Sequence, residues 1–144
     1  MKEINGDILH VDTGLALDIY NRFSYANVNT VKRVPGTCQI LGDIHKPMIA
    51  CLFGQYTPGK VGYWNKVYGQ WENTIETKEQ RLIWFKNSLD NLSEKLLNKN
   101  VKNIAFPFKI GCGLAGGNWK NYLGLIKEWE TNNKQYNVYI IHKK

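Results

Sequence analysis

The most constraining feature of the chain is a block at residues 104–119, where a short apolar run enters a loop dense in glycine. The run reads Ile-Ala-Phe, and four of the seven residues at 111–117 are glycine. Glycine has no Cβ, so this backbone can adopt positive φ angles and approach a ligand closely. From Trp119 onward the pattern becomes amphipathic. We therefore expect a strand, a loop and a helix in that order.

A strand–loop–helix unit of this kind brings backbone N–H groups together near the N-terminus of a helix. That arrangement favours an anion, most often a phosphate. The alternative is a glycine-rich turn that joins two elements and binds nothing. The glycines alone do not decide between the two interpretations.

The composition is that of an ordinary globular domain. The chain has 144 residues, of which 43% are hydrophobic and 22% charged, and this length favours a single domain, 1–144, with its own core. No apolar run approaches the roughly 20 residues that a membrane helix needs. The N-terminus has no apolar signal-peptide region. We expect a cytoplasmic protein with no membrane partner.

The net charge of +7 would suit a polyanionic partner, but the basic residues are spread over the whole chain. A phosphorylated small ligand fits this charge as well as nucleic acid does, and we expect no nucleic-acid partner. The three cysteines form no C-x-x-C pair, and the three histidines are scattered, so we expect neither a metal site nor a cofactor. Cys112 differs from the other two cysteines because it lies inside the glycine loop.

Periodicity and turn signals divide the chain into alternating elements. A helix over 14–23 has Asp12 or Thr13 as its N-cap. A longer helix begins at a Thr77–Gln80 capping box and ends near 98–100, and a last helix covers 119–129. Gly42-Asp43 reads as a turn, and the apolar run at 47–53 as a strand buried on both faces. The expected strands are 2–5, 37–41, 47–53, 101–106 and 138–141.

Between the elements, residues 55–73 show little periodicity and hold a cluster of aromatic side chains. These rings either pack a surface flap or stack on a nucleobase. The cluster comprises Tyr56, Tyr63, Trp64, Tyr68 and Trp71.

Strands that alternate with helices indicate an α/β sandwich with a largely parallel central sheet. Ligands of such sheets bind beyond the C-terminal ends of the strands, where residues 110–117 would lie.

Four segments together resemble one family, the macro domains. They read G-D-I-L at 6–9, G-L-A at 14–16, L-F-G-Q at 52–55 and I-A-F-P-F-K-I-G-C-G-L-A-G-G-N-W at 104–119. The closest likeness is to the small phage and bacterial branch related to ADP-ribose-1″-phosphate phosphatases and ADP-ribosyl-glutamate hydrolases. The resemblance implies a three-layer α/β/α sandwich with a mixed, largely parallel sheet.

The resemblance also implies a ligand, ADP-ribose or a related NAD-derived nucleotide. Asp7 and Ile8 hold the positions that recognise adenine in the family, with the carboxylate accepting from the exocyclic amine. The second family loop cradles the diphosphate and the distal ribose through backbone N–H groups. The implied ligand-binding residues are Asp7, Ile8, Gly14, Ile110, Gly111, Cys112, Gly113, Leu114, Ala115, Gly116, Gly117 and Asn118.

The chain also departs from the family pattern. An apolar strand and a loop with asparagine and glycines usually follow the G-D-I turn, but here Asp7 leads within a few residues to Gly14. Ala115 and Asn118 stand where hydrolytic branches carry an aspartate, and an amide cannot act as a general base at neutral pH. Gln55 follows the L-F-G segment, where one branch has a lysine nucleophile.

If catalysis survives these losses, His10 and Asp12 are the candidate catalytic residues. They alternate along a short segment, so on a strand they would face the same way and could activate water, with Thr13, Asn118 and Lys120 nearby. The alternative is an N-cap, Asp12, beside an exposed histidine. Cys112 would need a neighbouring base to become a nucleophile, and none is visible in the sequence.

Two functional classes therefore remain open. The chain is either a binder that reads or sequesters an ADP-ribose-type metabolite, such as a cyclic signalling nucleotide, or a hydrolase of ADP-ribose-1″-phosphate or of ADP-ribosylated protein. A degenerate fold that serves as a protein-interaction surface is a weaker third interpretation. A neighbouring subunit could replace the missing strand, which would make the protein a homo-oligomer.

Overall fold

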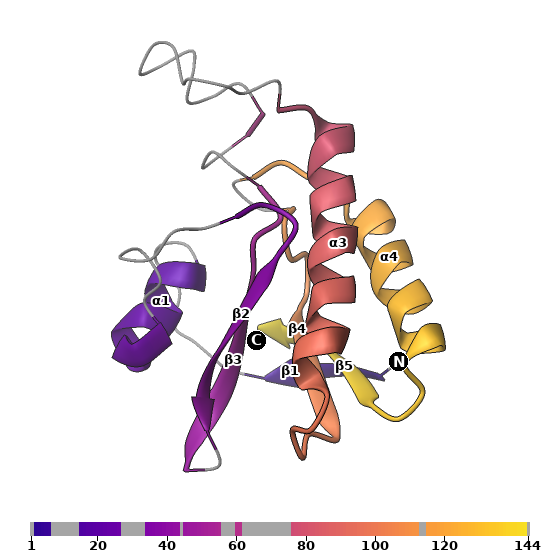
Figure 1. Cartoon of the computed structure of the whole chain (residues 1–144). Coiled ribbons are helices and arrows are strands. Elements are labelled where there is room, and N and C mark those ends of the chain that lie inside the picture. The colour runs from indigo at the N-terminus through magenta and orange to yellow at the C-terminus, as the bar shows by residue number, and fades with distance from the viewer. Residues whose placement is uncertain are drawn as a thin grey trace.

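The computed structural model describes residues 2–6, 15–26, 34–43, 45–55, 60–61, 76–112 and 115–143. These residues form a mixed α/β structure with two small sheets (Figure 1). The strands are β1 (Lys2–Gly6), β2 (Cys38–Asp43), β3 (Lys46–Leu52), β4 (Asn103–Pro107) and β5 (Asn137–Lys143). The helices are α1 (Leu15–Arg22), a short 3-10 turn η1 (Ser24–Ala26), α3 (Lys78–Leu96) and α4 (Trp119–Asn132).

The first sheet has three strands in the order β1-β5-β4, and both pairings are parallel. The central strand β5 pairs Ile141 with Ile4 of β1, and Ile140 with Phe106 of β4. The prediction of a largely parallel sheet is confirmed for these strands. Because the strands are parallel, the C-terminal ends of β4 and β5 lie at the same edge of the sheet, and β4 leads from that edge into the glycine loop.

The second sheet is an antiparallel hairpin of β2 and β3, which pairs Cys38 with Leu52. Two sequence expectations are wrong here. Gly42-Asp43 is not a turn, because both residues belong to β2, where the register shifts between Leu41 and Asp43 and Gly42 takes a φ of +91°. A glycine inside a strand marks such an irregularity as readily as it marks a turn.

The other wrong expectation concerns the apolar run at 47–53, which is not buried on both faces. Pro47 and Met48 are exposed, because β3 belongs to a hairpin and not to the centre of a parallel sheet. A short apolar run does not reveal on its own which kind of strand it forms.

Helix α3 connects the hairpin to the rest of the structure. Its Asn91 side chain accepts a hydrogen bond from the Cys38 N–H at 2.9 Å, and its Lys95 ammonium donates to the Cys38 carbonyl. On the core side, α3 buries the apolar stripe that the sequence predicts. Within the described residues, one core cluster joins this stripe to β2, α4, β4 and β5: Cys38, Phe85, Leu89, Leu92, Leu96, Phe106, Tyr122, Ile126, Trp129, Tyr136, Val138 and Ile140.

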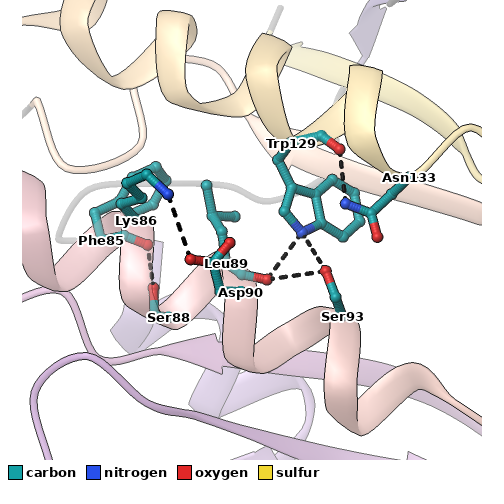
Figure 2. A network of polar contacts seen from close by, with 8 residues as sticks. All are labelled: Phe85, Lys86, Ser88, Leu89, Asp90, Ser93, Trp129 and Asn133. Carbon is teal, nitrogen blue, oxygen red and sulfur yellow. Dashed lines mark hydrogen bonds and ion pairs between the residues drawn. The ribbon is translucent and has the colours of Figure 1, made fainter.

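Helices α3 and α4 lie side by side and run in the same direction, with their N-termini at the same end (Figure 1). The Trp129 indole N–H of α4 fixes the position of the two helices along each other's axes. It donates to the Leu89 carbonyl at 2.8 Å and to the Ser93 hydroxyl at 2.7 Å, both on α3 (Figure 2). Asn133 at the end of α4 donates its amide N–H to the Trp129 carbonyl at 2.8 Å.

This contact brings the two helix N-termini to one level. Leu89 lies twelve residues after the α3 N-cap Thr77, and Trp129 lies eleven residues after the α4 N-cap Asn118. At about 1.5 Å of rise per residue, the two stretches span about 18 Å and about 16 Å. Both helices therefore start within about one turn of each other, beside the glycine loop.

Within the described residues, no helix combines the length and the apolar character that crossing a membrane requires.

Candidate functional site

The glycine loop lies where the sequence predicts it, between the end of β4 and the start of α4. Phe108 directly follows β4, and Trp119 is the first residue of α4. Their rings meet edge to face with centroids 5.3 Å apart, and the Phe108 ring also stacks on His142 at 4.0 Å. The two ends of the loop are thus held together by an aromatic contact.

Between these two ends, a backbone hydrogen bond closes the loop a second time. The Gly117 N–H donates to the Gly111 carbonyl at 3.1 Å. Both glycines lie against the Tyr122 ring of α4: a Cβ on Gly111 would approach Tyr122 Cε1 to 2.8 Å, and one on Gly117 would approach Tyr122 Cε2 to 2.6 Å. Packing on Tyr122 is therefore sufficient to explain why these two positions are glycine.

Gly116 has a different reason to be glycine. Its φ is +73°, a left-handed conformation that a residue with a Cβ rarely adopts. A Cβ here would also come within 2.9 Å of Lys60 Cγ, so the aliphatic part of Lys60 covers the loop at this point. A basic side chain from a distant segment, that of Lys60, therefore packs on the loop backbone at Gly116.

Asn118 is the N-cap of α4. Its side-chain oxygen accepts the Lys120 N–H at 3.0 Å, and its carbonyl accepts the N–H of Asn121 and of Tyr122. The Asn118 side chain thus caps the helix start. Lys120 is exposed in the first turn of α4.

A cavity of about 250 Å³ lies where the loop meets the starts of α3 and α4. Thr77 caps α3 there, accepting the Gln80 N–H at 3.0 Å, which confirms the helix start predicted from the sequence. The lining residues come from three separate stretches of the chain: Val61, Lys78, Arg81, Leu82, Ala115, Gly116, Gly117, Asn118, Asn121 and Tyr122.

The charges around this cavity favour an anion. Lys78 and Arg81 line it, Lys60 lies against Gly116, and no carboxylate or imidazole is among the described lining residues. Two helix N-termini add the positive ends of their dipoles. A negatively charged group in this cavity would meet the cations of α3 and the positive ends of two helices.

Sequence reasoning missed the buried ion pair next to the cavity. Arg81 is 2% exposed, and its Nε donates to Glu76 Oε1 at 2.7 Å, while its Nη1 donates to the Ala115 carbonyl at 3.2 Å. One signal was available in the sequence. Arg81 continues the core-facing spacing of Phe85 and Leu89 along α3, so a charged residue occupies a position where the helix is otherwise apolar.

Cys112 does not have the surroundings of a nucleophile. Its thiol donates to the Ile110 carbonyl, with 3.3 Å between Sγ and the oxygen. Burial raises the pKa of this thiol, although the nearby Lys109 charge acts in the opposite direction. The thiol is therefore protonated at neutral pH, and only a thiolate attacks.

The remaining predicted site residues lie outside the described residues. They are Asp7, Ile8, His10, Asp12, Thr13, Gly14, Gly113 and Leu114, so the predicted adenine contact and the predicted His10–Asp12 pair both stay predictions. The same holds for the five aromatic residues between 56 and 71. The structure brings together the predicted residues Ala115, Gly116, Gly117 and Asn118 at one cavity, and places Gly111 in hydrogen-bond contact with Gly117.

Among the described residues, no group of three or more His, Cys, Asp or Glu side chains is placed to hold a metal ion. The sequence matches no protein-family model, and no curated protein shows a significant match to it. The geometry of the loop and its cavity is thus the main basis for assigning a function.

Proposed function

We propose that the chain binds ADP-ribose or a related NAD-derived nucleotide, with the diphosphate against the glycine loop. The observation that carries the proposal is the cavity between the loop and the starts of α3 and α4, which the basic residues Lys78 and Arg81 line. The macro-domain motifs of the sequence supply the identity of the ligand, and with it the expectation of a three-layer sandwich.

The physical case rests on the match between a diphosphate and this cavity. A diphosphate carries negative charges on two adjoining groups and accepts several hydrogen bonds. Lys78, Arg81 and Lys60 supply positive charge from two separate segments, and Gly116 and Gly117 supply backbone without side chains. Charge-assisted hydrogen bonds to such groups are about twice as strong as those between neutral groups.

The size of the cavity limits what it can hold. At about 250 Å³ it is slightly smaller than typical small-molecule sites, which measure about 300 to 1,000 Å³. It suits the charged centre of a dinucleotide-like ligand with part of a sugar. In this proposal the adenine lies outside the cavity and is bound by Asp7 and Ile8, as the family resemblance implies.

The proposal is one of binding and not of turnover. A hydrolase needs a group that activates water, and the described lining residues include no carboxylate and no imidazole. In this proposal Lys78 and Arg81 serve as anion-binding groups. A binder of this kind would read or sequester an ADP-ribose-type metabolite, such as a cyclic signalling nucleotide.

Titration calorimetry with ADP-ribose, ADP and adenosine tests this proposal. We expect ADP-ribose and ADP to bind and adenosine to bind much more weakly, because adenosine lacks the diphosphate. Lys78→Gln should weaken ADP-ribose binding by about tenfold, the equivalent of about 1.4 kcal/mol. Lys127→Gln, which removes an exposed lysine from the body of α4, should leave binding unchanged.

An assay of turnover separates binding from hydrolysis. ADP-ribose-1″-phosphate and an ADP-ribosylated protein should both remain intact in the presence of the protein. Product formation that His10→Ala or Asp12→Ala abolishes would replace the binding proposal with hydrolysis. Failure of every ADP-ribose derivative to bind would rule out both.

A further inference from the structure

The ion pair of Arg81 and Glu76 is buried beside the cavity. The side chains are 3% and 4% exposed, and the two groups are 2.7 Å apart. Burying two charges costs free energy that their attraction only partly returns, and well-packed apolar residues often serve stability as well. The position of the pair, at the start of α3 and against the glycine loop, calls for another explanation.

Arg81 joins three parts of the site. It belongs to the first turns of α3, where its backbone N–H donates to the carbonyl of the N-cap Thr77 at 3.0 Å. Its guanidinium donates through Nε to Glu76 and through Nη1 to the Ala115 carbonyl of the loop. The guanidinium is a planar, rigid fork, so two contacts through different nitrogens fix its orientation relative to the loop.

The contact with Ala115 fixes the orientation of one loop peptide. In a trans peptide the C=O and the N–H point in opposite directions. Holding the Ala115 carbonyl toward Arg81 therefore sets the direction of the Gly116 N–H, and it turns the negative end of this peptide toward a cation. Arg81 thus controls the loop geometry at the peptide where Gly116 has its left-handed conformation.

Glu76 has the opposite effect on the charge of the same site, because its carboxylate is negative. Its carboxylate neutralises much of the Arg81 charge at a distance of 2.7 Å, and a bound anion would feel the field of both groups. The carboxylate stabilises the fold by compensating a buried cation. It simultaneously lowers the attraction of the cavity for an anion.

We propose that Arg81 is the positioning residue of the anion site, and that Glu76 sets the affinity of the site by neutralising part of its positive charge. The inference rests on the proposed function, because it assigns roles at the same cavity. It adds that folding stability and anion affinity respond to Glu76 in opposite directions, which a purely structural ion pair would not produce.

Two variants of the pair test the inference, with inorganic pyrophosphate and ADP-ribose as probes in titration calorimetry and with thermal unfolding of the same samples. Glu76→Gln keeps an oxygen that accepts from Arg81 but removes the negative charge. It should lower the melting temperature and tighten binding of both probes by roughly threefold to tenfold. Arg81→Gln should lower both the melting temperature and the affinity.

Arg81→Lys separates the charge of Arg81 from its shape. Lysine keeps the positive charge but cannot reach two acceptors with a rigid fork, so its affinity should lie between those of the natural protein and of Arg81→Gln. Affinity equal to that of the natural protein would overturn the positioning role. Asn91→Ala is the matched control, since it removes a hydrogen bond of α3 to β2 away from the loop. It should lower the melting temperature without changing either affinity.

The outcomes distinguish this inference from the proposed function. If Arg81→Gln does not fold, the binding measured for Glu76→Gln decides the test alone. Unchanged or weaker binding by Glu76→Gln overturns the inference while leaving ADP-ribose binding intact. Natural protein that binds pyrophosphate but not ADP-ribose retains the anion site and its two roles, and it overturns the proposed nucleotide. Natural protein that binds neither probe overturns both.

Discussion

The Gly117 N–H donates to the Gly111 carbonyl at 3.1 Å, and this bond draws the two halves of the glycine loop together over the Tyr122 ring. It leaves no room for a side chain at position 117, where a Cβ would lie 2.5 Å from the Gly111 oxygen. The shape of the loop is thus set by its own backbone and by α4 before any ligand binds.

Gly117→Ala should therefore lower the free energy of unfolding by about 2 kcal/mol or more, because the added methyl group overlaps backbone and ring atoms. Urea unfolding followed by tryptophan fluorescence measures the change. The matched control is Gly124→Ala on α4, where a Cβ would meet nothing within 4 Å. That variant should gain about 0.5 to 1 kcal/mol, since alanine is the better helix former. Equal effects of the two substitutions would show that the loop is not packed as described.

Trp129→Phe tests the contact that aligns α3 and α4. Phenylalanine keeps a ring in the core but cannot donate to Leu89 and Ser93, and it leaves space where the indole was. We expect a loss of about 2 kcal/mol in the free energy of unfolding. The affinity for ADP-ribose should also fall, because the helix N-termini lose their common level. Trp119→Phe, which keeps an aromatic contact with Phe108, should cost less stability; a larger loss at Trp119 than at Trp129 would contradict this account.

Lys109→Gly tests the backbone strain at the entrance of the loop. Lys109 has a φ of +59°, which costs a residue with a Cβ about 1 kcal/mol or more. Glycine should relieve this cost and raise the free energy of unfolding by about 0.5 kcal/mol after its own entropy loss. Lys102→Gly, a lysine outside the positive-φ positions of the structure, should lower stability instead. Urea midpoints that fall equally for both variants would argue against strain at Lys109.

The stability of the protein should fall at alkaline pH. Burial raises the pKa of the Cys38 and Cys112 thiols above their ordinary value of 9.0, and that of the Tyr122 hydroxyl above 10.0. In the unfolded chain these groups release their protons at lower pH than in the folded protein. Their contribution to stability is therefore complete below about pH 9 and is lost as the pH rises through the raised values. Urea midpoints measured from pH 7 to pH 11 should decline above about pH 9, and a flat profile would show that the three groups are not buried as described.

The strongest periodic and local signals predicted the fold best. The apolar stripe of Phe85, Leu89, Leu92 and Leu96 fixed α3, and the Thr77 cap placed its start. The β4–loop–α4 unit followed from the apolar run, the glycines and the amphipathic pattern that begins at Trp119. Each of these features depends on residues that are close together in the chain. Residue spacing and capping residues are therefore sufficient to predict them.

The features that the sequence did not reveal depend on residues far apart in the chain. The run at 47–53 forms a hairpin strand because it pairs with β2, and an apolar run does not reveal which strand it pairs with. The Arg81–Ala115 bond joins positions 34 residues apart, and the Trp129–Leu89 bond joins positions 40 residues apart. The cavity exists because of these long-range contacts, so its lining could be assembled only from the structure.

The measurement that most directly tests the central claim is a titration of isotope-labelled protein with ADP-ribose, observed through the backbone amide resonances of its glycines by NMR. We predict saturable shifts of the Gly116 and Gly117 amides with the same dissociation constant, together with an unshifted Gly124 amide, which lies on α4 away from the cavity. Saturable binding that leaves Gly116 and Gly117 unshifted, or no binding at all, would contradict the claim that the glycine loop holds the ligand.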